Sequence, residues 1–262
     1  MIYDSQEFAR VWKPVLLISA GAWTMLLIEP STIPLFGPCL ASSTGAMPSS
    51  FRMLLTVKTP ASLGAGWTLM LVAMMAPVLI QPVYHIRLRS FAHRHGRSIA
   101  IFLGGYTAIW MALGAVLLAM ELAVKSFEQQ GYLPLACVVL LTLIWQFSPS
   151  KQRCLNRCHA HPALAAFGTA ADVDAFHFGI MHGIWCAGSC WTLMLLPMSL
   201  ARGHVAAMAI VAVVIFSERL EPPRRPRWAC RGISKAIRIV TIQVRLRLSG
   251  APKARTPSLN MS

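Results

Sequence analysis

Six long apolar stretches constrain the fold of this chain more than any other feature. Each is close to the roughly 17–25 residues, about 30 Å of helix, that the hydrocarbon core of a bilayer requires. Backbone polar groups in lipid must be satisfied within one segment, so stretches of this kind are expected to be helical. The predicted spans are residues 11–28, 64–84, 99–124, 132–147, 176–200 and 205–220. The sequence therefore predicts an all-α, polytopic transmembrane helix bundle with about six spans.

The basic residues predict the orientation of these spans. The chain has 24 Lys and Arg residues. If the N-terminus is cytoplasmic, only Arg52, Lys58, Lys125 and Arg202 fall on the outer side. Cytoplasmic loops are enriched in Lys and Arg, so both termini are predicted to be cytoplasmic, in a bacterial cytoplasmic (inner) membrane. The net charge of +15 is then explained by topology and contact with anionic membrane lipids, and no nucleic-acid partner is expected.

The chain divides by composition into two parts. Residues 1–221 are predicted to form the transmembrane domain, and residues 222–262 a basic cytoplasmic tail that is disordered or interfacial. Three prolines end the last apolar helix, and no acidic residue follows Glu221. The outer loop over residues 29–63 is rich in Pro, Ser and Thr and is expected to be irregular.

One stripe of side chains in the fifth predicted span carries the main functional signal. Residues at four-residue intervals lie on one face of a helix. Imidazole, thiolate and thioether groups suit soft metals such as Cu(I), and ionisable groups placed in lipid are usually functional. The stripe consists of His182, Cys186, Cys190, Met194 and Met198. Because its first three members span about 12 Å, they would form two sites in series or need a second helix.

The second predicted span supplies the natural partner helix. It carries Met70, Met74 and Met75, whose thioethers stay neutral in lipid and bind Cu(I) in preference to Zn(II). Pro77 follows this group and is expected to make the helix irregular there. Close approach of a neighbouring helix would be allowed by small residues of the fifth span. These residues are Gly179, Gly183 and Gly188.

A cysteine pair lies in the inner loop before the fifth span. Cys154 and Cys158 are surrounded by Lys151, Arg153 and Arg157. Neighbouring cations lower the pKa of a thiol, so this pair is predicted to be thiolate-like. If the loop lies close to the start of the fifth span, the pair could pass an ion to His182 or Cys186, or receive one from them.

Other ionisable residues are expected to be solvated or ion-paired and to bind no metal. His85, His93 and His95 lie among arginines and are predicted to be solvated. Glu218, near the end of the last span, is expected to pair with the adjacent Arg219. No phosphate-binding loop, catalytic triad or paired carboxylates are found, so the chain is not expected to be an enzyme.

Three ordered motifs resemble the DUF2182 family of metal-binding integral membrane proteins, some of which are labelled copper chaperones. The first motif is Trp67, Met70, Ala73, Met74, Met75 and Pro77. The second is Gln146, Pro149, Lys151, Cys154, Leu155 and Cys158. The third is His182, Gly183, Cys186, Gly188, Cys190, Trp191, Leu193 and Met194. The resemblance covers about residues 67–220. It departs from the family at Ser189, where a second cysteine is common.

These patterns together predict an integral membrane protein that handles Cu(I), or another soft metal, by storage, sensing or delivery to a copper-dependent membrane protein. Its predicted ligands are His182, Cys186, Cys190, Met194, Met70, Met74, Met75, Cys154 and Cys158. Two alternatives stay open. One is a membrane thiol redox protein that cycles Cys186 with Cys190 or Cys154 with Cys158. The other is a metal-free membrane assembly scaffold.

Overall fold

The computed structural model describes residues 5–28, 60–126, 133–200 and 203–229. Helices account for nearly all of the regular structure in these ranges, which contain no strand, so the all-α prediction is confirmed. Among the described residues, four helical segments are long and apolar enough to cross a membrane: Gln6–Ile28, Gly64–Arg89, Ala92–Met120 and Gly168–Ser199. Shorter helices occupy the two remaining predicted spans. These are α7 (Leu133–Phe147) and α10 (His204–Arg219).

Two of the helices are longer than their apolar stretches. Helix α6 (His95–Ser126) and helix α9 (Gly168–Ser199) each have 32 residues and begin in polar sequence before the predicted span. Hydropathy marks where a helix enters lipid, and a helix can continue past that point. Helix α1 (Ser5–Ile28) likewise starts several residues early.

The second span is interrupted at the predicted place. Helix α4 (Pro60–Met75) is followed by the 3-10 helix η1 (Ala76–Leu79) and then by α5 (Ile80–Arg89). Pro77 lies in the first turn of η1, where its ring cannot donate the hydrogen bond that would continue the α-helix. The irregularity predicted at this proline is therefore confirmed.

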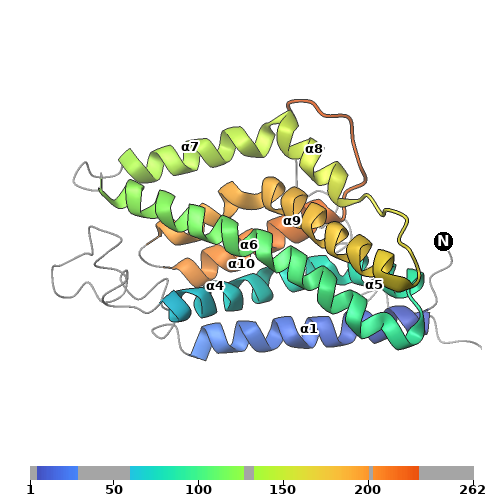
Figure 1. Cartoon of the computed structure of the whole chain (residues 1–262). Helices are drawn as coiled ribbons and strands as arrows, with labels where there is room; N and C mark the ends of the chain where they lie inside the picture. The colour runs from blue at the N-terminus through green and yellow to red at the C-terminus, as the bar shows by residue number, and fades with distance from the viewer. Residues whose placement is uncertain (1–4, 29–59, 127–132, 201–202, 230–262) are drawn as a thin grey trace, which may run out of the picture.

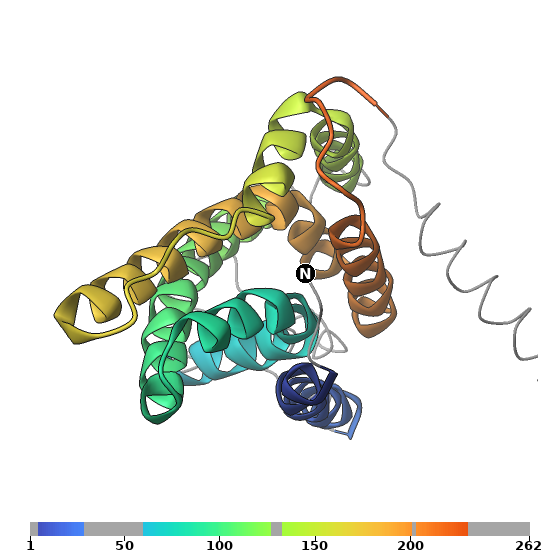
Figure 2. The same cartoon turned by 90° about the vertical axis from the view of Figure 1, so that its right-hand side faces the viewer.

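Helix α9 is the centre of the bundle. It packs most extensively against α6 and also against α7, α10 and α8 (Pro149–Cys158). Helix α1 lies on α4 and α5 at the other side (Figures 1 and 2). The chain runs back and forth along one axis, so successive long helices are antiparallel (Figure 1).

Glycines bring α6 and α9 into backbone contact. A Cβ atom added at Gly179 would lie 2.2 Å from the carbonyl oxygen of Phe102, and one at Gly183 would lie 3.0 Å from the Cβ of Ile109. The close approach predicted at these two glycines is confirmed. At Gly188 the neighbour is instead the Cys154 sulfur, 2.9 Å from an added Cβ.

One end of the bundle gathers the segments predicted to be cytoplasmic. We call it the basic end; it comprises residues 5–13, 80–97, 149–174 and 219–229 (Figure 1). Two acidic side chains lie between its arginines. Glu7 accepts from Arg87 at 3.0 Å, and Asp172 bridges Arg94 and Arg97 at 2.7 Å each. Exposed and half-buried pairs of this kind add little to stability, but they show that these segments meet at one end.

The start of the basic tail returns along α8. The side-chain amide of Asn156 donates to the carbonyl of Arg224 at 2.7 Å and accepts from its N–H at 3.1 Å. The N–H of Ala229 donates to the carbonyl of Phe147 at 3.4 Å. The rest of the predicted tail, residues 230–262, and the outer-loop residues 29–59 lie outside the described residues.

Candidate copper-handling site

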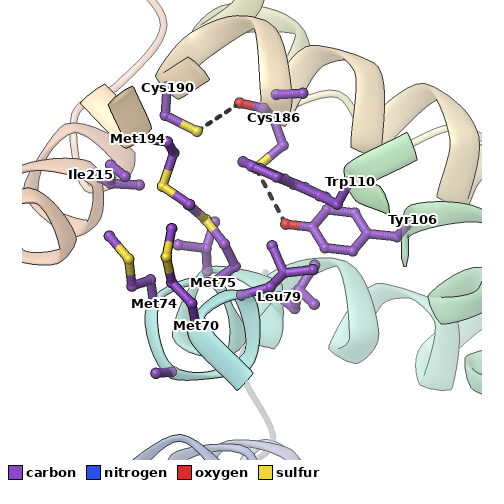
Figure 3. Close-up of a cluster of buried hydrophobic side chains, with 14 of the residues drawn as sticks. Met70, Met74, Met75, Leu79, Tyr106, Trp110, Cys186, Cys190, Met194 and Ile215 are labelled. Carbon is purple, nitrogen blue, oxygen red and sulfur yellow. Dashed lines mark hydrogen bonds between the residues drawn. The ribbon is translucent and has the colours of Figure 1, made fainter. Parts of the chain in front are cut away.

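The stripe of α9 faces the interior of the bundle along its whole length. Its members are almost completely buried, from 4% exposure at His182 to 0% at Met194. The three methionines of α4 are buried to the same degree. Met194 points from α9 toward Met70 and Met74 on α4 (Figure 3). We call His182, Cys186, Cys190, Met194, Met70, Met74 and Met75 the donor column.

Aromatic side chains of α6 fill the space beside the two thiols. The Tyr106 hydroxyl and the Cys186 sulfur form a hydrogen bond of 3.5 Å, and the Cys190 thiol donates to the carbonyl of Cys186 at 3.1 Å (Figure 3). Trp110 and Tyr106 are both fully buried. Soft, weakly hydrogen-bonded sulfur atoms thus line an otherwise apolar interior.

Aromatic rings surround the His182 imidazole, and its Nε2 atom makes no hydrogen bond. Its ring lies among those of Phe102, Tyr106 and Phe178, with centroids 5.8 to 6.0 Å away. Its Nε2 atom is buried and has no hydrogen-bond partner. Buried polar atoms are nearly always satisfied, so an orphaned one calls for an explanation, and a bound ligand is one. This nitrogen is available to a metal ion.

A cavity of about 410 Å³ at the basic end reaches His182. Its walls also carry Cys158, His161, Arg219 and Glu221. Another wall residue, His159, has both ring nitrogens on backbone carbonyls, those of Leu155 and Arg219, at 2.9 and 3.1 Å. Because both ring nitrogens of His159 lie against backbone carbonyls, the cavity-wall side chains with a nitrogen or sulfur atom suited to a soft metal are Cys158, His161 and His182.

His85 is buried, so the prediction that it is solvated is wrong. Helix α5 turns its ring inward, where Nε2 lies 2.9 Å from the carbonyl of Pro162 and the ring centroid lies 4.9 Å from that of His161. Burial, and then His85, lower the pKa of His161 below its usual value. His161 is therefore neutral at neutral pH, the form that binds metals.

The prediction that Cys154 and Cys158 have lowered pKa values is also wrong. Burial raises the pKa of Cys158 to about 12 and raises that of Cys154 as well. The local cations do not oppose it, because Lys151 is turned inward and Arg157 lies over the Trp185 ring, 5.0 Å from its centroid. Both thiols are protonated at neutral pH, so metal binding here releases protons.

Lys151 belongs to a buried polar cluster that the sequence did not reveal. Its ammonium lies 2.8 Å from one carboxylate oxygen of Glu218 and 2.9 Å from the other, and both side chains are almost fully buried. The Gln146 amide bonds to both partners. Glu218 therefore pairs with Lys151, and the predicted pairing with Arg219 is wrong. This cluster joins α7, α8 and α10 beside the cavity.

Arg219 does not pair with Glu218 and lies on the cavity wall instead. Its guanidinium donates to the Ser189 hydroxyl at 3.4 Å, and Arg219 lines the cavity together with Cys158. Adjacent residues of α10 thus point to different partners. The cation that lowers the pKa of Cys158, against the larger effect of burial, is therefore Arg219 of α10 and not a basic residue of the loop before α9.

Residues 64–242 match the family described as PpoB2, copper chaperone. The chain belongs to this copper chaperone family. The match begins in α4 and continues past α10, so it includes the donor column, the cavity and the first part of the tail. No curated protein and no solved structure matches the chain.

In a copper chaperone, copper is cargo and not a resident cofactor. Within the described ranges, no three His, Cys, Asp or Glu side chains converge closely enough to hold an ion together. The donors instead follow one another from the cavity into the bundle. The sequence analysis gave His161 no role and assigned Arg219 only a pairing with Glu218. The available signals were the place of His161 three residues after Cys158 and that of Arg219 directly after Glu218.

Proposed function

We propose that this protein handles Cu(I) within the bacterial cytoplasmic membrane, exchanging it at the cavity of the basic end and holding or passing it along the donor column. The single observation that carries this proposal is the continuous, buried series of soft donors that starts at the unpartnered nitrogen of His182. Membership of the copper chaperone family supports copper as the cargo.

The chemistry of such a column is ligand exchange. Donors four residues apart on α9 are about 6 Å apart along the helix axis, so an ion can contact one donor before it leaves the previous one. Cu(I) accepts two or three soft ligands and binds thioethers as well as thiolates. Thioethers add no charge to the interior, so Met70, Met74 and Met194 can receive an ion without a proton leaving. No step requires catalysis.

The donors are also expected to pack well without metal. Methionine and protonated cysteine pack as apolar side chains. The ionisable groups of the donor column are His182, which is enclosed by aromatic rings, and the buried thiols of Cys186 and Cys190. An empty column is therefore an ordinary packed core, which is suitable for a protein that must both take and release its cargo.

Metal analysis of the anaerobically purified full chain tests this function. We expect Cu(I) bound to the wild type, and less copper in His182→Ala and in the double variant Cys186→Ser, Cys190→Ser. Cys137→Ser is the matched control because Cys137 is an exposed thiol on α7, away from the column. Equal copper content in all four proteins would contradict the proposal and favour a metal-free scaffold.

A further inference from the structure

Three side chains on the wall of the cavity at the basic end each bury a polar atom that has no hydrogen-bond partner among the described residues. These atoms are Nε2 of His182, Nε of Arg219 and Oε1 of Glu221. Buried polar atoms are nearly always paired, so three of them around one cavity point to a ligand that the cavity takes up. Each atom is itself covered, and a ligand would reach it through a change of side-chain rotamer, which is common on binding.

The other contacts of these side chains leave the three atoms available. Arg219 donates through Nη2 to the Ser189 hydroxyl at 3.4 Å, which leaves its Nε–H as a donor. The second carboxylate oxygen of Glu221, Oε2, lies 3.6 Å from the guanidinium of exposed Arg224, so Oε1 remains an acceptor. Nε2 of His182 can offer a lone pair to a soft metal. The wall therefore presents one donor, one acceptor and one metal ligand.

The volume of the cavity suits a small molecule better than a lone ion. It encloses about 410 Å³, within the range of about 300–1,000 Å³ in which proteins bind small ligands. Over the ranges that the structure describes, no three His, Cys, Asp or Glu side chains are placed to share an ion. Copper at His182 would therefore be completed by a ligand that it brings with it.

We propose that the cavity binds Cu(I) together with a small thiol that carries a carboxylate and an ammonium group, as free cysteine or a short cysteine-containing peptide does. The thiolate and His182 hold the ion, the carboxylate accepts from Arg219, and the ammonium donates to Glu221. Opposite charges then meet at both ends of the thiol. This inference rests on the proposed copper function and names the class of carrier from which the protein takes its cargo.

The transfer can be written in balance. The carrier complex holds Cu(I) between two thiolates. Nε2 of His182 forms a bond to copper, one sulfur–copper bond breaks, and the displaced thiolate leaves and takes a proton from solvent. One thiolate stays on the ion, so Cu(I) and this sulfur together carry no net charge. Copper stays Cu(I), and nothing is oxidised or reduced.

Cys158 on the same wall is suited to the next exchange. Burial raises its pKa to about 12, so the thiol keeps its proton at neutral pH. When its sulfur replaces the remaining carrier sulfur on copper, one sulfur–copper bond forms and one breaks. The proton of Cys158 moves to the departing thiolate, and the carrier leaves as a neutral thiol group.

Four matched thiols test this recognition on the wild-type full chain, in lipid nanodiscs without oxygen. The probes are the Cu(I) complexes of cysteine, of cysteamine, which lacks the carboxylate, of 3-mercaptopropionate, which lacks the ammonium, and of 2-mercaptoethanol, which lacks both. We expect isotope-labelled cysteine to be retained together with copper. Its complex should bind about 10-fold or more tightly than a complex that lacks one group, as for a lost hydrogen bond to a charged partner. Equal affinity for all four complexes would overturn the inference.

Two variants assign the contacts separately. Arg219→Met should weaken binding of the cysteine and 3-mercaptopropionate complexes and leave that of the cysteamine complex unchanged. Glu221→Gln should weaken binding of the cysteine and cysteamine complexes and leave that of the 3-mercaptopropionate complex unchanged. Arg153→Gln removes an exposed cation of α8 outside the cavity wall and should match the wild type with every thiol. A variant that weakens all four complexes alike would overturn the contact assigned to its side chain.

The outcomes separate this inference from the proposed function. If the wild type takes up Cu(I) equally from every complex and retains no labelled thiol, copper handling stands and recognition of the carrier is overturned. If the wild type takes up no Cu(I) from any of the four, both fail.

Discussion

Removal of the buried charge of Lys151 is the sharpest test of how the basic end is built. In Lys151→Met the ammonium is lost while the chain length is nearly kept. The Glu218 carboxylate then stays buried with only Gln146 as partner. Breaking a buried ion pair by removing one member costs about 3–5 kcal/mol of the free energy of unfolding, because an uncompensated charge remains. Since α8 is attached through this pair, Cys158 should also become more exposed.

A double-mutant cycle isolates the pair itself. Glu218→Gln alone should also destabilise, whereas Lys151→Met with Glu218→Gln should cost at least about 2 kcal/mol less than the sum of the two, as expected for residues in direct contact. Reversible unfolding in mixed detergent micelles gives the four free energies. Arg153→Met is the control and should stay within about 0.5 kcal/mol of wild type, because its side chain is exposed. Additive costs, or a Lys151→Met variant as stable as the control, would refute this reasoning.

Three further outcomes follow from packing and protonation. Gly179→Ala should lower the melting temperature because its Cβ would meet a backbone oxygen of α6 at 2.2 Å, whereas Gly104→Ala, with no atom within 4 Å, should not. Alkylation of Cys158 should be much slower than that of exposed Cys137 at pH 8 and should accelerate as pH rises toward its pKa of about 12, since only the thiolate reacts; equal rates would contradict its burial. Met194→Leu conserves volume, so it should cost less than about 1.5 kcal/mol in thermal unfolding yet reduce bound copper; unchanged copper would make this methionine a packing residue.

Sequence periodicity was enough to predict how α9 presents its side chains. Residues four apart must share a helix face, so the alignment of His182, Cys186 and Cys190 follows from local geometry. That this face is buried could also be expected, because ionisable groups are rarely placed against lipid. The glycines that admit α6, and the break at Pro77, are equally local features.

The electrostatics of the basic end could not be obtained in this way. Lys151 lies among other basic residues in the sequence, yet its partner Glu218 is 67 positions away. Arg219 lies instead on the cavity wall with Cys158, and burial outweighs the effect that the basic loop was expected to have on the pKa of Cys158. His85 was misjudged for the same reason: its neighbours in sequence are charged, but α5 continues to Arg89 and turns this ring toward His161.

Location of bound metal by anomalous scattering from crystals of the full chain loaded with Cu(I) tests the central claim most directly. The account predicts peaks inside the bundle, beside the sulfurs of α9 between the cavity and Met194, with none at exposed Cys137. Metal found only on the surface, with the interior between α4 and α9 unchanged and empty of peaks, would contradict it.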